Sequence, residues 1–424
     1  MFSTRETCRV CNGELVSVFN LGDIYVSTFV DTADSTAPKV PLELVLCQNC
    51  NLVQLRDTVD SGVMYSDYWY KSGLNKSMRE ALLNVVESVQ QRVKLEKSDT
   101  VLDIGANDGT LLSYYPENVT RVAVEPSNLW DLGSDHADIV IHDYFNVDSY
   151  YAHVKNRAKI ITAIAMFYDL EHPHTFVEDL RDCLAYDGII VIQLMDLLSM
   201  LRTNDFPNLC HEHLEYYSLA NLVELFAAHD LTIFDVEYNA VNGGSLRIYA
   251  RHADGSAPLP TVKLALGMEN MIIGNVRLSL NRFAKFSEMS RSAVCNFIRD
   301  AKARGNTVAV MGASTKGNTI LQYYGLTGAD IDHAGEINAD KYGKMTIGSN
   351  IPIISDKESL LSKPAYYLIL PWGFTDSFIK RYDAYLREGG QFIVPLPWPE
   401  LICYSGDTLC RYPINEDGST TLQS

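Results

Sequence analysis

The sequence predicts an α/β protein in which a small zinc-binding module is followed by two doubly wound, Rossmann-like domains. Two Cys-x2-Cys pairs lie within the first 50 residues, and such pairs are typical metal ligands in a chain without an export signal. Two later stretches of the chain each alternate apolar strand-like runs with amphipathic helical patterns. That alternation predicts a parallel sheet covered by helices on both faces, once in each stretch.

Composition excludes several classes of function. The chain has 424 residues, 47% of them hydrophobic, which suits a globular protein of about two to four domains. Its 35 basic and 53 acidic residues give a formal net charge of −18, which repels nucleic-acid phosphates. No segment has the pattern of a signal peptide or a membrane span, so we expect a cytoplasmic protein without a membrane partner.

The first predicted domain, residues 1–64, carries the cysteine pairs. Cys8 and Cys11 form one Cys-x2-Cys knuckle, and Cys47 and Cys50 form the other. Four thiolates complete a tetrahedral shell, which is the arrangement of a closed structural zinc site. Buried free thiols and a redox pair are the alternatives; the redox interpretation is disfavoured because neither pair opens a helix after a strand.

The second predicted domain, residues 65–252, has strand-like runs at 101–104, 121–125, 159–164 and 188–192, after a helical stretch at 78–93. A glycine-bearing loop, 105–109, follows the first strand, and Glu125 ends the second. The glycines let the backbone come close to a bound ligand, and the acidic residue can accept hydrogen bonds from both hydroxyls of a ribose. Both features suit S-adenosylmethionine and a dinucleotide equally.

The loop details favour S-adenosylmethionine. Only Gly105 and Gly109 fit the dinucleotide pattern, and Asp108 would repel a diphosphate but not a sulfonium. A nucleotide site and a bare packing turn remain as alternatives. The complete set of residues expected to bind this cofactor comprises Asp103, Gly105, Asn107, Asp108, Glu125, Asp143, Tyr144, Phe145 and Phe167.

A dense group of titratable residues, Cys210 to Glu215, is the candidate for acid–base chemistry. It departs from the His-Glu-x-x-His zinc-protease pattern because residue 215 is glutamate. In an extended segment His211 and His213 would share one face, and histidine suits proton abstraction near neutral pH. A catalytic metal site shared with residues 171–174 and a polar surface loop are the alternatives.

The third predicted domain, residues 253–424, begins with a linker at 254–260 and a long helical region at 262–304. Strand-like runs follow at 307–311, 366–370 and 391–394. The loop 312–319 matches neither the P-loop nor the dinucleotide pattern. Its lysine, hydroxyls and free amides at a helix start would still hold the diphosphate of a nucleotide-sugar; NAD and a purely structural loop are the alternatives.

Taken together, these motifs make the chain resemble the sugar C-methyltransferases, the nucleotide-hexose C-3-methyltransferases of deoxysugar biosynthesis. Residues 8–55 resemble the family's zinc-binding domain, and residues 65–250 resemble its methyltransferase domain. The segments 312–318, 370–372 and 392–397 resemble its C-terminal domain. The resemblance implies methyl transfer from S-adenosylmethionine to a sugar carbon, with a nucleotide-linked keto-sugar as partner.

The resemblance also implies roles for individual residues. Glu212 and His213 match the family's Glu-His pair, with His213 as the favoured base and His211 secondary. Tyr70, before Lys71-Ser72-Gly73, matches a tyrosine that reaches the sugar, whereas Cys210 stands where some relatives have tyrosine. Tyr70 is therefore counted as both catalytic and substrate-binding, and the other expected substrate-binding residues are Asn242, Ser314, Thr315, Lys316, Asn318 and Trp372.

These residues imply an enolate mechanism. A keto group acidifies the neighbouring C–H, His213 removes the proton, and Tyr70 steadies the enolate oxygen while the carbon attacks the methyl group. An NAD-dependent nucleotide-sugar oxidoreductase or epimerase and an inactive ligand-binding scaffold are the alternative functions.

Overall fold

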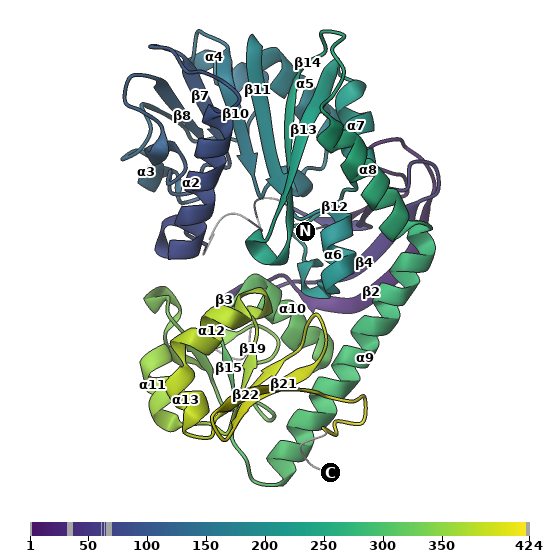
Figure 1. Ribbon diagram of the computed structural model, residues 1–424, viewed down its shortest axis with the longest axis vertical. Helices are drawn as coiled ribbons and strands as arrows, with labels where there is room; N and C mark the ends of the chain where they lie inside the picture. Colours follow the sequence, from purple (N-terminus) through teal and green to yellow (C-terminus); the bar gives the residue numbers. More distant parts are fainter. Residues whose placement is uncertain (1, 32–36, 61, 63, 65–69, 421–424) are drawn as a thin grey trace.

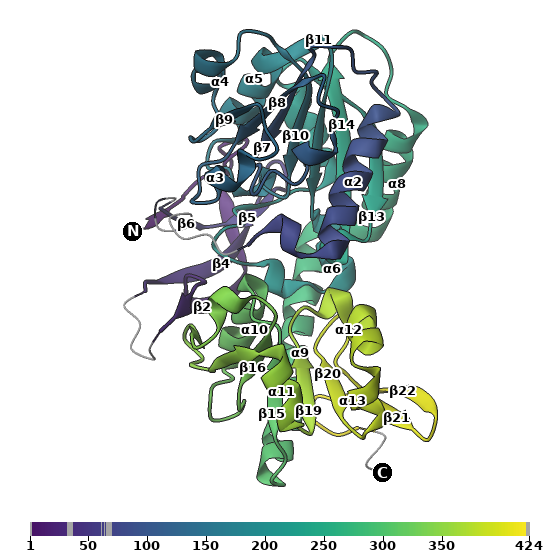
Figure 2. The same cartoon turned by 90° about the vertical axis from the view of Figure 1, so that its left-hand side faces the viewer.

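The computed structural model describes residues 2–31, 37–60, 62, 64 and 70–420. Two seven-stranded sheets form the two ends of the molecule, and an N-terminal β module lies between them on one side (Figure 1, Figure 2). The predicted α/β class with two Rossmann-like sheets and an N-terminal cysteine cluster is confirmed. No helix among the described residues is long and apolar enough to cross a membrane.

The first large sheet has strand order β13-β14-β11-β10-β7-β8-β9. Five of its strands are parallel, in the doubly wound order 3-2-1-4-5, and β13 and β14 run antiparallel at one edge. The bounds of its strands are β7 Thr100–Ile104, β8 Thr120–Val124, β9 Ile139–Ile141, β10 Ala158–Ile164, β11 Leu184–Leu194, β13 Leu231–Asn239 and β14 Ser245–His252.

Helices cover both faces of this sheet (Figure 1). Strand β7 is buried along its whole length and rich in β-branched residues, as a central parallel strand requires. The α-helices are α2 Lys76–Gln90, α3 Trp130–Gly133, α4 Val147–His153, α5 Pro173–Cys183, α6 Leu197–Thr203, α7 Leu219–Ala227 and α8 Pro260–Ile273. Short 3-10 turns are η1 Ser72–Leu74, η2 Leu112–Tyr114, η3 Phe167–Asp169, η4 Phe206–Asn208 and η5 Val241–Gly243.

The second large sheet has strand order β18-β16-β15-β19-β20-β21-β22. Its five parallel strands repeat the order 3-2-1-4-5, and the hairpin β21–β22 adds two antiparallel strands. Its strands are β15 Val308–Met311, β16 Ala334–Glu336, β18 Ile353–Ser355, β19 Tyr366–Ile369, β20 Gln391–Val394, β21 Glu400–Ser405 and β22 Thr408–Pro413. The two sheets therefore share one topology, although the sequence shows no internal repeat.

The helices of this half begin with α9, a 28-residue helix of about 42 Å that runs along the molecule toward the second sheet (Figure 1). The predicted single helical region 262–304 is in fact two helices. Gly274 has a φ of 53°, and the Asn275 side chain accepts a hydrogen bond from the Leu278 amide to begin α9. The helices are α9 Val276–Ala303, α10 Thr315–Tyr324, α11 Asp356–Ser362, α12 Thr375–Arg381 and α13 Asp383–Arg387, with turns η6 Ala339–Lys341 and η7 Trp372–Phe374.

The N-terminal module is tied to both halves by strand pairing. Its strands are β1 Phe2–Thr4, β2 Leu15–Tyr25, β3 Phe29–Val30, β4 Lys39–Cys47, β5 Val53–Leu55 and β6 Asp57–Val59. Strand β12, Glu215–Tyr216, extends the β2-β4-β5 sheet, and β17, Met345–Thr346, pairs with β3. One hydrophobic cluster continues from β2 and β4 through α6 and α9 into the second large sheet. The division of the chain at residues 64 and 252 stays a prediction.

Candidate active site

A cavity of about 1060 Å³ lies where the carboxyl ends of the parallel strands in the two large sheets face each other. Both Rossmann-like halves line it, as expected for ligands at the carboxyl edge of an open α/β sheet. The predicted site residues that line it are Tyr70, Asp103, Gly105, Asn107, Glu125, Tyr144, Phe145, Glu212, His213, Asn242, Ser314, Thr315, Lys316 and Trp372. Five predicted residues are not among its lining: Asp108, Asp143, Phe167, His211 and Asn318.

Glu125 follows β8 and forms the floor of the expected donor site. Its carboxylate accepts hydrogen bonds from the amides of Asn107, at 2.7 Å, and Ser127, at 2.8 Å. The side chain is 6% exposed, so these two bonds fix its position. Each carboxylate oxygen keeps lone-pair capacity for a further donor, which suits ribose hydroxyls.

The loop after β7 requires glycine at Gly105. Its φ is +68°, and a Cβ there would lie 3.2 Å from the Met166 side chain. Asp103, two residues earlier on β7, accepts a hydrogen bond from the Thr162 hydroxyl at 2.6 Å, and burial raises its pKa to about 7. Asp103 therefore links β7 to β10, and it lines the cavity.

Asn107 and Asp108 hold the segment that carries Tyr70. The Asn107 side chain accepts from the Ser72 amide at 3.0 Å and donates to the Tyr70 carbonyl at 3.0 Å. Asp108 accepts from the Gly73 amide at 2.7 Å and from the Thr110 hydroxyl at 2.6 Å. Asp108 is not among the lining residues, and its two oxygens hold this segment and the loop that leads into η2, so its role as a cofactor contact stays a prediction.

Asp143 and Phe167 are also absent from the cavity lining. Asp143 is exposed and accepts from the amide of Tyr144, whereas Tyr144 and Phe145 line the cavity. Phe167 is fully buried, with its ring packed against Phe176, and belongs to the core of the first large sheet. The fourth-strand end presents Met166 to the cavity in its place.

The segment 210–213 is a turn, not the extended strand that was expected. The His213 amide donates to the Cys210 carbonyl at 3.1 Å, and regular strand structure starts only at β12. The turn directs Glu212 and His213 into the cavity and His211 away from it. His211 is 5% exposed and its Nε2 bonds the Val40 carbonyl at 3.0 Å, so it anchors the turn to the N-terminal module.

His213 has a defined tautomer. Its Nδ1 lies 2.9 Å from the Asn208 carbonyl, which only accepts, so Nδ1 carries the proton and Nε2 the lone pair. Burial and the nearby Lys316 ammonium lower the pKa of His213 to about 3, which keeps the ring neutral. Burial raises the pKa of Glu212 to about 7. A carboxylate oxygen of Glu212 and a ring nitrogen of His213 lie within 4.8 Å of each other.

The opposite wall comes from the second large sheet. Ser314 caps α10, and Gly312 before it has a φ of +82°, where a Cβ would lie 2.7 Å from Pro371. Lys316 Nζ lies 3.1 Å from Asp205 Oδ2. Asn318 is not among the lining residues and donates to the Ser27 hydroxyl at 3.0 Å, so its place in the substrate site stays a prediction.

The second large sheet has a glutamate, Glu336, at the position that corresponds to Glu125 in the first. Glu336 ends β16 and accepts from the Ala313 amide at 2.8 Å and the Asn338 amide at 3.0 Å, as Glu125 accepts from its own loop. Lys341 donates to the Ala313 carbonyl at 2.7 Å and lies 3.7 Å from Glu336. Ala313, Glu336, Asn338 and Lys341 all line the cavity. Sequence reasoning left Lys341 out because no motif contains it.

Sequence reasoning also missed Asp205 and Asn208, which are contributed by the loop and turn after α6. Asp205 is fully buried and pairs with Lys316, and the Asn208 carbonyl sets the tautomer of His213. The shared metal site with residues 171–174 is not formed. Glu171 pairs with Arg9, and His174 Nε2 bonds the Val10 carbonyl at 2.8 Å.

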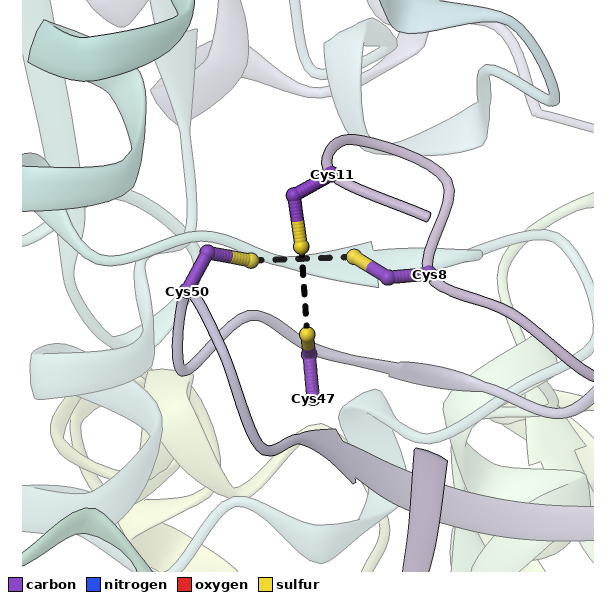
Figure 3. A group of neighbouring side chains, drawn as sticks. All are labelled: Cys8, Cys11, Cys47 and Cys50. Atoms are coloured by element: carbon purple, nitrogen blue, oxygen red, sulfur yellow. Dashed lines mark hydrogen bonds between the residues drawn. The ribbon is translucent and has the colours of Figure 1, made fainter. Parts of the chain in front are cut away.

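The four N-terminal cysteines converge as predicted (Figure 3). The Sγ atoms are 3.7 Å apart for Cys8 and Cys50 and 3.3 Å apart for Cys11 and Cys47. A tetrahedral shell with zinc–sulfur bonds of about 2.3 Å places sulfurs roughly 3.8 Å apart, so the four thiols fit zinc. The Gln54 side chain donates to Cys8 Sγ at 3.2 Å, which favours the thiolate form.

Purified protein is expected to contain about one zinc per chain, held by these four cysteines. Cys47→Ser should sharply reduce the yield of folded protein, because the free energy of zinc binding contributes directly to the folding of the module. Elemental analysis and soluble yield measure both effects. Cys410→Ser, on β22, is the matched control and should leave both unchanged; folded, active protein without zinc would contradict the assignment.

Three domain families match the chain in consecutive order. They are a "putative zinc binding domain" over residues 8–65, a "methyltransferase domain" over residues 74–236 and a "C-methyltransferase C-terminal domain" over residues 240–397. The chain is also similar to the C-methyltransferase NovU of Streptomyces niveus. The two are 29% identical over 406 residues, which span 94% of this chain and 97% of NovU.

Among solved structures, the chain is similar to an S-adenosylmethionine-dependent methyltransferase from Clostridium acetobutylicum, with 9% identity and a TM-score of 0.34. That match covers 41% of this chain and 92% of the other. It is also similar to the magnesium protoporphyrin IX methyltransferase ChlM of Synechocystis, with 9% identity and a TM-score of 0.32. That match covers 44% of this chain and 86% of the other.

Proposed function

We propose that this chain is an S-adenosylmethionine-dependent C-methyltransferase that methylates a sugar carbon, C3, next to the keto group of a nucleotide-linked 4-keto-deoxysugar. The three consecutive domain matches and the similarity to NovU support this proposal. The observation that best supports this proposal is that three elements line one cavity: the Glu125 loop, the Glu212–His213 turn and the wall that contains Lys316. A donor, a base and an anion-binding surface are what such a reaction requires. The domain matches displace the NAD-dependent alternative.

The geometry of Glu125 supports its role as ribose acceptor, with Tyr144 and Phe145 beside it on the cavity wall. S-adenosylmethionine supplies an electrophilic methyl group when bound. This chain's own part is to hold the donor and to create a carbon nucleophile, since a sugar carbon attacks a methyl group only after it has lost a proton.

His213 is the proposed base. Its Nε2 carries a lone pair at neutral pH because Nδ1–H is held by the Asn208 carbonyl. Proton uptake at Nε2 forms an imidazolium, and the ionised Glu212 carboxylate, within 4.8 Å, stabilises that charge. His211 is left out of the proposed catalytic set because its ring bonds Val40 outside the cavity.

Tyr70 is the proposed donor to the enolate oxygen. It is 45% exposed and lines the cavity, and its backbone carbonyl is held by Asn107. Partial desolvation at the cavity wall, together with the nearby Asp108 charge, raises the pKa of Tyr70 to about 12. The phenol therefore stays protonated and can donate a hydrogen bond to a developing oxyanion.

The second sheet's wall is the proposed site of the nucleotide-sugar's diphosphate. Lys316, Lys341 and Arg381 line the cavity, and the hydroxyls of Ser314 and Thr315 stand at the start of α10. Cations and a helix N-terminus together suit a phosphate group. Trp372 lies on the same wall and approaches Gly243 of the η5 turn, and this turn brings Asn242 to the cavity from the first large sheet.

The proposal includes the domain roles and the compartment. Residues 1–64 bind zinc, residues 65–252 bind the methyl donor, and residues 253–424 help to bind the nucleotide-sugar. None of the nine cysteines forms a disulfide, as is usual in the reducing, cytoplasmic compartment that we propose.

The acceptor class can be tested with a panel of nucleotide-sugars. The protein is incubated with S-adenosylmethionine and each 4-keto sugar, and with the same sugar reduced to the alcohol. We expect a mass gain of one methyl substituent and equal release of S-adenosylhomocysteine with a keto-sugar only, because only the ketone acidifies the neighbouring C–H. Equal methylation of the reduced sugar would contradict the enolate chemistry.

The reaction is expected to depend on pH through Glu212. Because burial raises the pKa of Glu212 to about 7, its ionised form predominates above that pH and is lost as the pH falls through it. The kcat/KM for sugar should therefore rise through about pH 7 to a plateau. Glu212→Gln should lower the plateau roughly tenfold and remove the rise. A variant profile that still rises at pH 7 would assign the titration to another group.

A further inference from the structure

A second group of metal-ligating side chains lies inside the cavity. Cys210, Glu212 and His213 bring a thiol sulfur, a carboxylate oxygen and a ring nitrogen within 4.8 Å of one another. All three residues line the cavity. The group is separate from the four N-terminal cysteines, which form their own cluster within the part of the chain that the structure describes.

The donor set is one that zinc and similar borderline or soft cations prefer. Thiolate, carboxylate and imidazole are the three protein ligand types of zinc sites, and three ligands leave a fourth position open to the cavity. The ligand atoms lie within 4.8 Å of one another, and a closed zinc–thiolate shell has ligand atoms roughly 3.8 Å apart. Rotation of the Cys210 and Glu212 side chains about their single bonds can shorten these distances.

His213 is already oriented as a metal ligand. Its Nδ1–H donates to the Asn208 carbonyl at 2.9 Å, which leaves Nε2 as the nitrogen with a lone pair. A carbonyl or carboxylate behind the other ring nitrogen is the usual support of a ligating histidine, because it fixes both tautomer and ring direction. The Tyr168 ring, with its centroid 4.3 Å from that of His213, further restricts the imidazole.

Charge in this part of the cavity also favours a cation. Asp169, Asp205 and Glu212 line the same cavity, and the adjacent ammonium of Lys316 is paired with Asp205 at 3.1 Å. Carboxylates therefore outnumber the ammonium group around the turn 210–213. A bound divalent cation would add the positive charge that this arrangement lacks.

We propose that Cys210, Glu212 and His213 bind a zinc-like divalent cation and that this cation inhibits methyl transfer. The bound ion occupies the imidazole lone pair that accepts the substrate proton and the space beside it. The inhibition rests on the proposed role of His213 as the base, whereas the binding depends only on the three ligands.

Binding is tested on the full chain with its N-terminal site already filled by zinc. Cobalt(II) is then titrated as the probe, because a cobalt–thiolate bond gives a charge-transfer absorption band that reports sulfur ligation directly. We expect one additional equivalent with this band in the wild type. Cys210→Ser should abolish the band, and Cys410→Ser, with its thiol outside the cavity, should retain it.

Inhibition is tested with zinc itself. Added zinc should inhibit methyl transfer reversibly, and a chelator too weak to strip the N-terminal site should restore activity. Loss of a direct ligand should weaken affinity at least as much as loss of a supporting residue, so Cys210→Ser should raise the inhibitory zinc concentration about tenfold or more. Each variant is compared with its own uninhibited rate, and Cys410→Ser should match the wild type.

The two readouts separate this proposal from the proposed function. A cobalt titration that ends without an additional equivalent, or a band that survives in Cys210→Ser, would overturn the cation site even if keto-sugars are methylated. A cobalt–Cys210 band in a protein that methylates no keto-sugar would support the cation site and reject the acceptor. Zinc binding at Cys210 without inhibition would overturn the inhibitory role.

Discussion

His213→Asn is expected to slow methyl transfer by about a hundredfold or more, because the substrate carbon then loses its proton acceptor. Donor binding should remain, since His213 lies on the turn at 210–213 and not on the loop that holds Glu125. Single-turnover rates with saturating donor and sugar measure the chemical step, and calorimetry checks donor binding.

His211→Asn is the matched control. It removes a histidine two residues away whose ring bonds the Val40 carbonyl outside the cavity. Its effect should be mainly on thermal stability, with a smaller loss of rate. If His211→Asn slows the chemical step more than His213→Asn, the base assignment is wrong by two residues.

Glu125→Ala is expected to weaken S-adenosylmethionine binding by roughly ten- to a hundredfold, or about 1.5–3 kcal/mol. The substitution removes the charged acceptor for the ribose hydroxyls and frees the amides of Asn107 and Ser127. Calorimetric titration with S-adenosylmethionine measures the loss.

Glu336→Ala is the control for the loss of hydrogen bonds to loop amides, which Glu125→Ala also causes. Glu336 holds the amides of its own loop in the same way, but in the second sheet. Its loss should leave the donor dissociation constant unchanged while raising KM for the sugar nucleotide. Unchanged donor affinity in Glu125→Ala, or equal losses in both variants, would reject Glu125 as the ribose acceptor.

Strand positions and strand-end residues could be predicted from the sequence because the signals are local. Runs such as 101–104 are apolar and β-branched, and β7 at Thr100–Ile104 confirms that run. Carboxyl ends of parallel strands meet at one edge of a sheet, so the sequence predicts that Gly105 and Glu125 lie near each other. The cysteine cluster is also a local signal, because each Cys-x2-Cys pair places two thiols on one side of a short turn and two such pairs complete one zinc site.

Contacts between distant segments could not be predicted in this way. The pairing of β5 with β12 joins residues more than a hundred positions apart, and it shapes the turn that separates His213 from His211. Phe167 shows the same limit, since periodicity cannot tell a strand-end aromatic in a cavity from one in the core. The shared topology of the two sheets also has no sequence signature, because two sheets can have the same strand order without having similar amino-acid sequences.

Exchange of the acidic sugar C–H with deuterated water tests most directly whether this chain makes a carbon nucleophile through an enolate. The keto-sugar nucleotide is incubated with protein and S-adenosylhomocysteine, so that the donor site is filled but no methyl group can be transferred. We expect deuterium at the carbon next to the ketone with wild-type protein and with His211→Asn, and almost none with His213→Asn. Exchange at the wild-type rate in His213→Asn would contradict the account.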